Sequence, residues 1–543
     1  MISQFDPFLD EHIKKYGNAG RGNPSYLSAN ICEEFITLMS KKVFSAIISE
    51  LREAKYYSLS VDSTPDVCHI DQLTFTVGYV KDDAPKERFL EFLPIHGHGA
   101  EYLADVVVQF LEGAGIPISD CHGHSYDNAS NMAGQYSGLQ ARIKEINKFA
   151  VYVPCAGHSL NLVGVKAAEC NMQVVSYFDF VQHLDTFFSA STHRWNVLVS
   201  SVGPAHKIVK RLSDTRWSAH ADAVNALCDG YERIQAALDS LSSDKTQTKD
   251  TTHDALSRLK KMEKLETIFL TIVWNDILLR FNETSTTVQK EDINLSVAIN
   301  IIQSLKLYVQ EIRDKFNEYE VKAKAKAPEA DYSDQGKRVK QRSSRLTGFE
   351  GAASDTVLQG RQKFHTETYL PIMDSIINGL TRRGDAYKDI SNRFGFFVNL
   401  RDMDGKEMSE HCIKLASYYH QDLEKSNLIS ECQQFKHYTF EKKETMSLSC
   451  IYKIINNDKL GTAFPNLEIA LRIFLSMMVT NCSGERSFSK LKLIKSELRN
   501  RMLQARLNSL ALLGIESEMV QEIEFSDIIK DFAIRKSRRK HIV

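Results

Sequence analysis

The chain has 543 residues, of which 43% are hydrophobic, and its 68 Lys and Arg residues are balanced by 69 Asp and Glu residues. Because single hydrophobic cores stop growing at roughly 250–300 residues, this length predicts more than one domain. The near-zero net charge excludes a global attraction to polyanions, so any nucleic-acid binding has to use local basic patches. The ten cysteines form no C-x-x-C pair, and neither a signal peptide nor a membrane span is apparent. We therefore expect a nuclear or cytoplasmic protein with no membrane partner.

The first 155 residues alternate between helical and strand-like patterns. A helix is expected from Ala29, and three strands with period-two alternation follow at 56–61, 72–80 and 88–95. A helix over 101–115, a fourth strand over 121–126 and a fifth over 150–153 follow, with a helix between these last two strands and another after the fifth, which completes the order β-β-β-α-β-α-β-α. This is the order of a ribonuclease H-like domain, which is a mixed five-stranded sheet with flanking helices.

Two carboxylates fall at neighbouring strand ends. Asp62 ends the first strand, and Asp127 lies within SYDNASNMAG just after the fourth. Ligand sites of open α/β sheets usually lie at strand ends, and paired carboxylates suit the two metal ions of phosphoryl transfer. The alternative is that Asp127 and Asn128 form a turn, and that Cys155, in YVPCAGHSLNL, is simply buried.

From about residue 170 to about 460 the pattern is helical. Amphipathic helices are predicted at 174–188, 221–241, 253–280, 294–319 and 368–380. Arg216 and Trp217 precede one of them, and such a pair suits phosphate contact with base stacking, although a Trp that anchors the core is an equal alternative. Residues 321–350 form a basic loop that is either solvated or a DNA contact through Lys337, Arg338 and Lys340.

A third carboxylate comes from residues 464–515. The helix expected after Pro465 is apolar almost all round, which predicts burial. Ser483-Gly484 then interrupts the run, and a new helix is expected to open at Glu485, on the same stripe as Phe488. The Glu485 carboxylate should therefore face the protein, where a metal, a neighbouring base such as Arg486 or the helix N-terminus would satisfy it.

Five segments, SVDSTPD, HSYDNASNMAG, YVPCAGHSLNL, DTRWSAH and NCSGERSFSKLKLIKSELRNRM, occur in this order. Together they resemble the hAT superfamily of DNA transposases, and most closely its branch of MYM-type and TTF-type zinc-finger proteins. The resemblance runs from about residue 30 to 520, and its last block is similar to the hAT C-terminal dimerisation region.

The resemblance implies a site and an organisation. An acidic triad of Asp62, Asp127 and Glu485 would bind Mg²⁺ or Mn²⁺ in a ribonuclease H-like core that a helical domain interrupts. His158 would lie near the scissile phosphate, Cys155 would share its motif in contact with DNA, and Arg216-Trp217 would bind DNA, with the Trp stacked on a flipped base. The expected domains are an N-terminal helical segment (1–54), the first part of the core (55–180), the helical insertion (181–460), the core completion with the dimerisation region (461–520) and a basic tail (521–543).

Two features depart from the family pattern. The Cys and His spacing before Asp62 supports no zinc finger, so we expect a chain without one and no structural zinc. Ser-Thr-Pro-Asp follows Asp62 where many active members have an aromatic residue, so Asp66 is an alternative ligand.

Three functions remain open at this level. The first is a dimeric, DNA-binding, transposase-like protein with a Mg²⁺-dependent site for DNA cleavage and strand transfer. The second is a domesticated, inactive relative that acts as a dimeric nuclear regulator binding DNA or protein. The third is an unrelated zinc hydrolase with ligands drawn from His96, His98, Cys121, His122, His124 and His158, whose spacing is not compact.

Overall fold

The chain folds as two compact units in a computed structural model that describes residues 11, 13–15, 28–127, 129–213, 217–290, 293–333, 358–439 and 447–534. One unit combines Met1–Cys155 with Asn392–Val543, and the other is Ala156–Ser391. The first unit is therefore built from the two ends of the sequence. Within the described ranges, no helix is both long and apolar enough to cross a membrane.

The first unit contains a mixed five-stranded sheet. Its strands are β1 (Tyr57–Pro65), β2 (Asp71–Lys81), β3 (Ala84–Ile95), β4 (Cys121–Ser125) and β5 (Val151–Tyr152), in the spatial order β3-β2-β1-β4-β5. β1, β2 and β3 pair antiparallel, whereas β4 runs parallel to β1 and β5 runs parallel to β4. The predicted mixed five-stranded sheet, with an antiparallel meander first, is confirmed.

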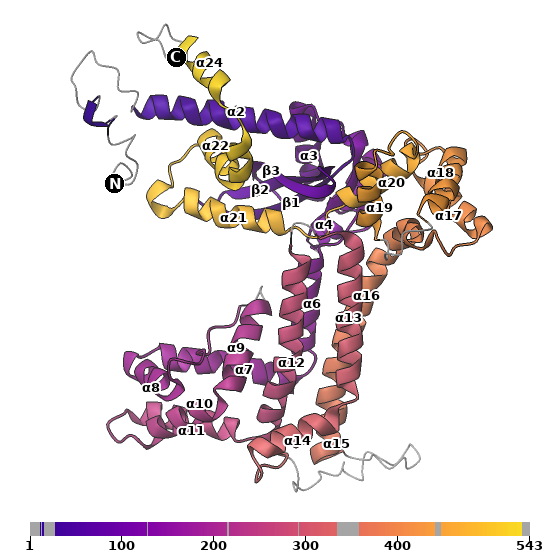
Figure 1. Ribbon diagram of the computed structural model, residues 1–543. Coiled ribbons are helices and arrows are strands. Elements are labelled where there is room, and N and C mark those ends of the chain that lie inside the picture. Colours follow the sequence, from indigo (N-terminus) through magenta and orange to yellow (C-terminus); the bar gives the residue numbers. More distant parts are fainter. Residues whose placement is uncertain are drawn as a thin grey trace. The chain divides into compact units, whose positions relative to one another are not determined.

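The two faces of this sheet differ in chemistry because side chains alternate along a strand. On β1 the apolar side chains alternate with small or polar ones: Tyr57, Leu59 and Val61 against Ser58, Ser60 and Asp62. On the apolar face, Phe75 of β2 packs against Phe110 of α3 (Ala100–Ala114), with ring centroids 4.4 Å apart. On the polar face, the Thr74 hydroxyl lies 3.1 Å from that of Ser487, which belongs to α21 (Cys482–Ile494). The polar face therefore receives a helix from the far end of the chain (Figure 1).

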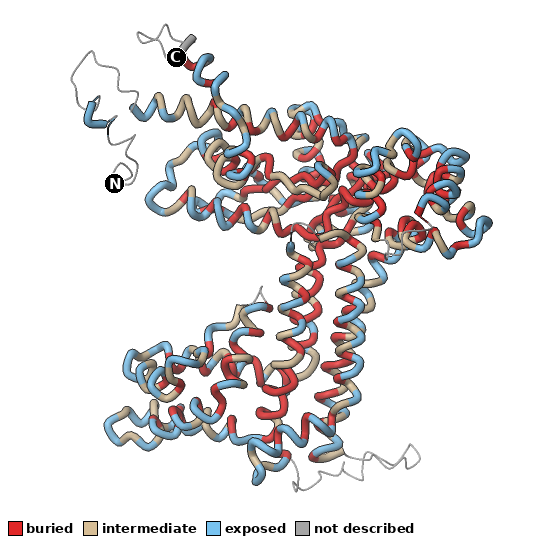
Figure 2. Tube along the Cα trace, viewed as in Figure 1, coloured by how far each residue is buried: buried red, intermediate tan, exposed pale blue. Residues whose placement is uncertain are grey.

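The other helices of this unit come from both ends of the sequence. They are α2 (Ala29–Ala54), α4 (Ser130–Ala133), α5 (Leu139–Ile146), α17 (Gly405–Tyr418), α18 (Lys425–Tyr438), α19 (Leu448–Asn457), α20 (Pro465–Ser476), α22 (Gln504–Ile515), α23 (Ser517–Glu522) and α24 (Ser526–Ile534). One hydrophobic core joins the sheet with α2, α3, α5, α21 and α22. Buried residues concentrate at the sheet and at the helices that flank it (Figure 2). The helix predicted after Pro465 is present, and its residues are largely buried.

In its described residues, the second unit is helical. Its helices are α6 (Ala156–Ala168), α7 (Met172–Ser189), α8 (Thr192–Val202), α9 (Trp217–Asp229), α10 (Tyr231–Ser243), α11 (Lys249–Met262), α12 (Leu265–Val288), α13 (Leu295–Arg313), α14 (Phe316–Lys326), α15 (Gly360–Phe364) and α16 (Leu370–Phe394), the last of which extends into the other unit.

Three stretches that the sequence predicts as single helices each form two helices in the structure. The stretch 221–241 is interrupted at Gly230, 253–280 between α11 and α12, and 294–319 between α13 and α14. Each interruption is only one or two residues long, so the apolar spacing on either side continues almost unchanged. The prediction of single helices was wrong for this reason.

Candidate functional site

Asp62 lies within β1, and Asp127 lies two residues beyond the end of the neighbouring parallel strand β4. Ser60 of β1 is paired with Ser125 of β4, and each acid lies two residues further along its own strand direction. The backbone N–H of Ser63 donates a 2.8 Å hydrogen bond to Asp62 Oδ1. Asp127 Oδ1 accepts a 3.2 Å hydrogen bond from the N–H of Ala129. Asn128, the other residue of the turn considered from the sequence, lies outside the described residues, so that turn stays a prediction.

Glu485 reaches the same region from α21. This helix begins at Cys482, three residues before the predicted start, because Gly484 does not interrupt it. A Cβ at Gly484 would lie 2.7 Å from Asn481 Oδ1 and 3.1 Å from Thr74 Cγ2. The absence of a side chain at Gly484 therefore lets the first turn of the helix approach the sheet closely. Glu485 is half-buried there.

The charges of Asp127 and Glu485 both act on the carboxyl group of Asp62. Burial raises the pKa of Asp62 first, and the negative charges of Asp127 and Glu485 raise it further, while hydrogen bonds from Ser63 and Asn481 lower it. The net result is a pKa of about 7 for Asp62. Such a rise is the expected effect of like charges gathered around a partly desolvated carboxyl group. The fold thus brings the three acids together from positions more than 350 residues apart in the sequence.

The donor chemistry of this acid cluster suits a hard divalent cation, since Mg²⁺ prefers oxygen ligands. Among the described residues, however, no three His, Cys, Asp or Glu side chains are already placed so that they could hold a metal ion. Mg²⁺ commonly keeps several waters and uses one or two carboxylates together with substrate phosphates. The acids therefore fit such an ion in their donor type, without forming a closed protein cage.

Asn481 connects the parts of the acid cluster and was not singled out in the sequence. Its side chain donates to Asp62 and its Oδ1 accepts from the Ser60 hydroxyl. Its backbone N–H donates to Cys155 Sγ at 3.3 Å. Cys155 is only 1% exposed, and its thiol contacts the backbone of the residue whose side chain binds Asp62. The only sequence signal for Asn481 was its place in the TNCSGER block that precedes Glu485.

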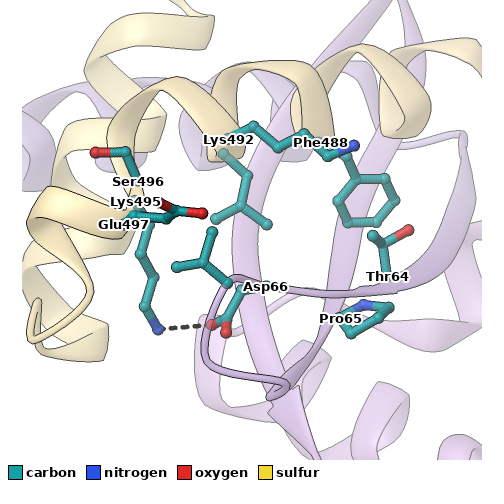
Figure 3. Close-up of a pocket in the computed structure, with 10 residues that line it drawn as sticks. Thr64, Pro65, Asp66, Phe488, Lys492, Lys495, Ser496 and Glu497 are labelled. Carbon is teal, nitrogen blue, oxygen red and sulfur yellow. Dashed lines mark hydrogen bonds and ion pairs between the residues drawn. The ribbon is translucent and has the colours of Figure 1, made fainter. Parts of the chain in front are cut away.

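Asp66, the alternative ligand, is bound elsewhere. Its Oδ2 lies 2.6 Å from Lys495 Nζ, and both side chains are almost fully buried (Figure 3). It also accepts hydrogen bonds from the N–H groups of Cys68 and Ile70 and from the Gln72 amide. Burial alone would raise the pKa of Asp66, but these hydrogen bonds lower it below its ordinary value. The carboxylate of Asp66 therefore stabilises the turn after β1.

The remaining predicted site residues lie in or near the second unit. His158 is half-buried in the first turn of α6, and its predicted role stays a prediction. Arg216, Lys337, Arg338 and Lys340 lie outside the described residues, as does Asn128.

Trp217 begins α9 and is only 6% exposed. Its ring is stacked on that of His220, with centroids 4.4 Å apart and an interplanar angle of 17°. A Cβ at Gly164 would lie 2.4–2.9 Å from Cδ2, Cε2 and Cγ of the indole, which are atoms at the middle of its face. The backbone of α6 therefore covers one face of Trp217, and His220 covers the other.

A cavity of about 540 Å³ adjoins this aromatic pair. Phe178 and His220 line it together with Trp217, and Gln182, Arg211 and Asp179 add polar groups. The buried indole Nε1–H of Trp217 finds no hydrogen-bond acceptor within the described part of the chain. The cavity thus has aromatic walls.

The two histidines and the cysteine of β4 are buried. His122 Nε2 lies 2.9 Å from Asp422 Oδ2, and its Nδ1 lies 3.0 Å from the Asp120 carbonyl oxygen. Burial lowers the pKa of His124 to about 3 and raises that of the Cys121 thiol to about 12. These side chains are packed in the interior of the first unit.

Two family models match the chain. The model described as ZMYM1/FAM200, RNase-like domain matches residues 9–138, and the hAT family C-terminal dimerisation region matches residues 432–519. The first match includes Asp62 and Asp127, and the second includes Glu485 and Asn481. The acid cluster is therefore assembled from both matched regions.

The chain also resembles two characterised proteins over most of its length. Both are named 52 kDa repressor of the inhibitor of the protein kinase. The one from Mus musculus is 20% identical over 550 residues, and the one from Homo sapiens is 19% identical over 543 residues. Each match covers 95% of this chain and 69% of the relative.

These matches define a protein with an RNase-like domain and a hAT-type dimerisation region. The chain is thus similar to hAT-type proteins in these two regions, and the resemblance found in its five ordered motifs is confirmed.

Proposed function

We propose that this chain is a dimeric, DNA-binding, transposase-like protein with a ribonuclease H-like core, in which Asp62, Asp127 and Glu485 form a site for Mg²⁺ or Mn²⁺ that acts on DNA phosphodiesters. The observation that carries this proposal is the placement of Asp62 and Asp127, each two residues beyond the paired Ser60 and Ser125 of parallel strands, where burial and the charges of Asp127 and Glu485 raise the pKa of Asp62 to about 7. The strand order β3-β2-β1-β4-β5 and the matches at both ends of the sequence support it.

Each residue has a distinct part in this mechanism. Asp62 in β1, Asp127 just beyond the parallel strand β4, and Glu485, on the helix above them, would hold the ions. Bound metal ions would activate the attacking oxygen and stabilise charge on the leaving oxygen. Asn481 orients the Asp62 carboxylate through its side-chain hydrogen bond, and Ser60 in turn holds Asn481.

DNA contacts outside the acid cluster complete the proposal. His158 is assigned to the scissile phosphate, and Arg216 with Lys337, Arg338 and Lys340 to the DNA backbone, where each cation would add a salt-dependent contribution to affinity. Trp217 and the adjacent cavity of about 540 Å³ are assigned to an extrahelical base. We place the protein in the nucleus, where such a substrate is found.

The test is a cleavage assay on supercoiled plasmid that carries the DNA flanking the gene for this chain. The wild-type protein should nick it with Mg²⁺ or Mn²⁺ and not with EDTA, and Asp127→Asn should lower the rate at least 100-fold, as expected for loss of a metal ligand. A matched control is Asp82→Asn, which changes an exposed acid at the start of the β2–β3 turn. Asn tolerates the positive φ of 49° found there.

A second candidate is a non-catalytic dimeric regulator with the same fold. Two observations favour it: in the described part of the chain no three His, Cys, Asp or Glu side chains are already placed to hold a metal, and both relatives are named repressors. In the same assay, it predicts that the wild type and Asp127→Asn are equally inert at every metal concentration while both remain dimeric and bind DNA.

A further inference from the structure

Three leucines near the end of α21 project into solvent. Leu493 is 75% exposed, Leu498 97% and Leu503 78%. Among the large apolar residues of the described ranges, only Tyr136 and Met172 are comparably exposed. Apolar side chains that gather in one exposed stretch usually mark an interaction surface. We call these three residues the leucine cluster.

A pocket of about 380 Å³ is lined by residues that adjoin Leu493 and Leu498 in the sequence (Figure 3). One wall is Thr64–Val67 at the end of β1, and the other is formed by residues between Phe488 and Glu497. The second wall therefore belongs to the segment that carries Leu493 and directly precedes Leu498. Pro65, Val67, Phe488 and Leu491 give the pocket apolar surface. Since a cavity of about 150 Å³ can hold benzene, this space is ample for a leucine side chain.

Two contacts fix the walls of this pocket relative to each other. The buried ion pair of Asp66 with Lys495 joins the turn after β1 to the end of α21. The Cys68 thiol donates to the carbonyl oxygen of Asn500 at 3.2 Å, which joins the same turn to the segment beyond the helix. A pocket with walls held in this way loses little entropy when it is filled.

The rim of the pocket carries one charge of each sign. Lys492 and Glu497 both line the pocket and are exposed, and neither forms an ion pair within the described ranges. In a two-fold symmetric contact, each residue of one copy meets a different residue of the other. A rim with one Lys and one Glu is therefore self-complementary, because the Lys of each copy can face the Glu of the other.

The occupant that fits this surface is a second copy of the chain. The leucine cluster and one wall of the pocket lie inside residues 432–519, which match the hAT dimerisation region. We propose that two copies associate through an isologous contact in which Leu498 of each copy enters the pocket between β1 and α21 of the other. This inference rests on the proposed dimer. It adds residues 64–67 of the RNase-like region to the interface, which the matched dimerisation region does not include.

The contact would lie directly beside the acid cluster. Thr64 is two residues beyond Asp62 on β1, and Phe488 is three residues beyond Glu485 on α21. Filling the pocket would therefore clamp the two elements that carry these acids. The association of two copies would therefore affect the relative position of β1 and α21, and with it the positions of Asp62 and Glu485.

The first experiment measures the mass of the full-length chain by sedimentation equilibrium. The wild type should be a dimer, and Leu498→Asp should raise the dimer dissociation constant about 30-fold or more, as for the loss of a central interface residue. Met172→Asp is the matched control, because Met172 is 79% exposed on a different unit. It should dimerise like the wild type.

The second experiment tests whether Leu498 enters the pocket. Val67→Trp fills the pocket but keeps the leucine, whereas Leu498→Asp keeps the pocket but lacks the leucine. Each variant alone should be mostly monomeric, and a mixture of the two should form heterodimers, because one leucine then meets one open pocket. If Leu498→Asp dissociates but the mixture does not associate, the insertion is wrong.

The outcomes separate this inference from the proposed function. A wild-type dimer that neither Leu498→Asp nor Val67→Trp weakens would overturn the interface and leave the proposed dimer standing. A wild-type chain that is monomeric at all concentrations would overturn both. Circular dichroism of each variant confirms that the fold is retained.

Discussion

Lys495 Nζ lies 2.6 Å from Asp66 Oδ2, and this buried ion pair joins residues 429 positions apart in the sequence. One partner follows β1 and the other ends α21, so the pair ties together the two elements that carry Asp62 and Glu485. Breaking a buried ion pair by removing one partner is costly, because the remaining charge has no compensation.

Asp66→Asn should therefore destabilise the protein by about 3–5 kcal/mol. The Asn side chain cannot neutralise Lys495, which is only 4% exposed. Urea denaturation of the wild type and the variant measures this difference, with Asp82→Asn as a control that should change stability by less than about 0.5 kcal/mol. A loss below about 1 kcal/mol for Asp66→Asn would show that the pair is not essential to this junction.

The same carboxylate should give the wild type a stability that depends on acid pH. The pKa of Asp66 is lowered in the folded state, so its contribution is fully present above the unfolded pKa of about 3.9 and is lost as the pH falls through the folded value. The difference in unfolding free energy between wild type and Asp66→Asn should accordingly shrink below about pH 4. Denaturation curves between pH 3 and pH 7 give this difference directly.

Asp62 should have the opposite effect on stability. Its folded pKa of about 7 lies above the unfolded value, so its favourable contribution is present at low pH and is lost as the pH rises through about 7. Asp62→Asn should therefore stabilise the metal-free protein at pH 8 by about 2–4 kcal/mol and change little near pH 4. Thermal unfolding in EDTA at both pH values tests this, and a loss of stability at pH 8 would argue against mutual repulsion among the acids.

Asn481→Ala tests whether the Asn481 side chain orients the Asp62 carboxylate. Without the amide, Asp62 loses a hydrogen bond that lowers its pKa, and the Ser60 hydroxyl loses its acceptor. We expect the pKa of Asp62 to rise further and the midpoint of any pH–rate profile for DNA cleavage to move to higher pH. Asn481→Asp is unsuitable as the conservative variant because it adds charge, so Asn481→Gln serves to test partial rescue. An unchanged pH profile in Asn481→Ala would show that the amide does not orient Asp62.

The sheet was predictable because it depends on local sequence patterns. Period-two alternation indicated β1, β2 and β3, and Asp127 follows β4 as expected, but Asp62 lies within β1, which continues to Pro65 and does not end at the acid. The role of Asn481 was not predictable, because its partners Ser60 and Cys155 lie more than 300 positions away. The ion pair of Asp66 with Lys495 escaped prediction for the same reason. Such contacts depend on how distant elements pack, which no spacing rule records.

His220 should control access to Trp217. Gly164 of α6 covers one face of the indole and His220 covers the other, so an extrahelical base can stack on Trp217 only if His220 moves away. His220→Ala should leave that face open toward the cavity of about 540 Å³. We expect tighter binding of single-stranded DNA that contains 2-aminopurine, with stronger quenching of its fluorescence, by roughly the 1–3 kcal/mol typical of one stacked base.

A second variant distinguishes stacking from a general loosening of the second unit. Gly164→Ala places a methyl group against the face of the Trp217 indole that α6 covers. The substitution should therefore displace the indole and destabilise the second unit by about 1–3 kcal/mol without improving DNA binding. His183→Ala, an exposed histidine on α7, is the control for loss of a surface imidazole and should match the wild type. If His220→Ala binds the 2-aminopurine DNA no better than His183→Ala, the base does not stack on Trp217, because removing the ring that covers this face of the indole would have had no effect.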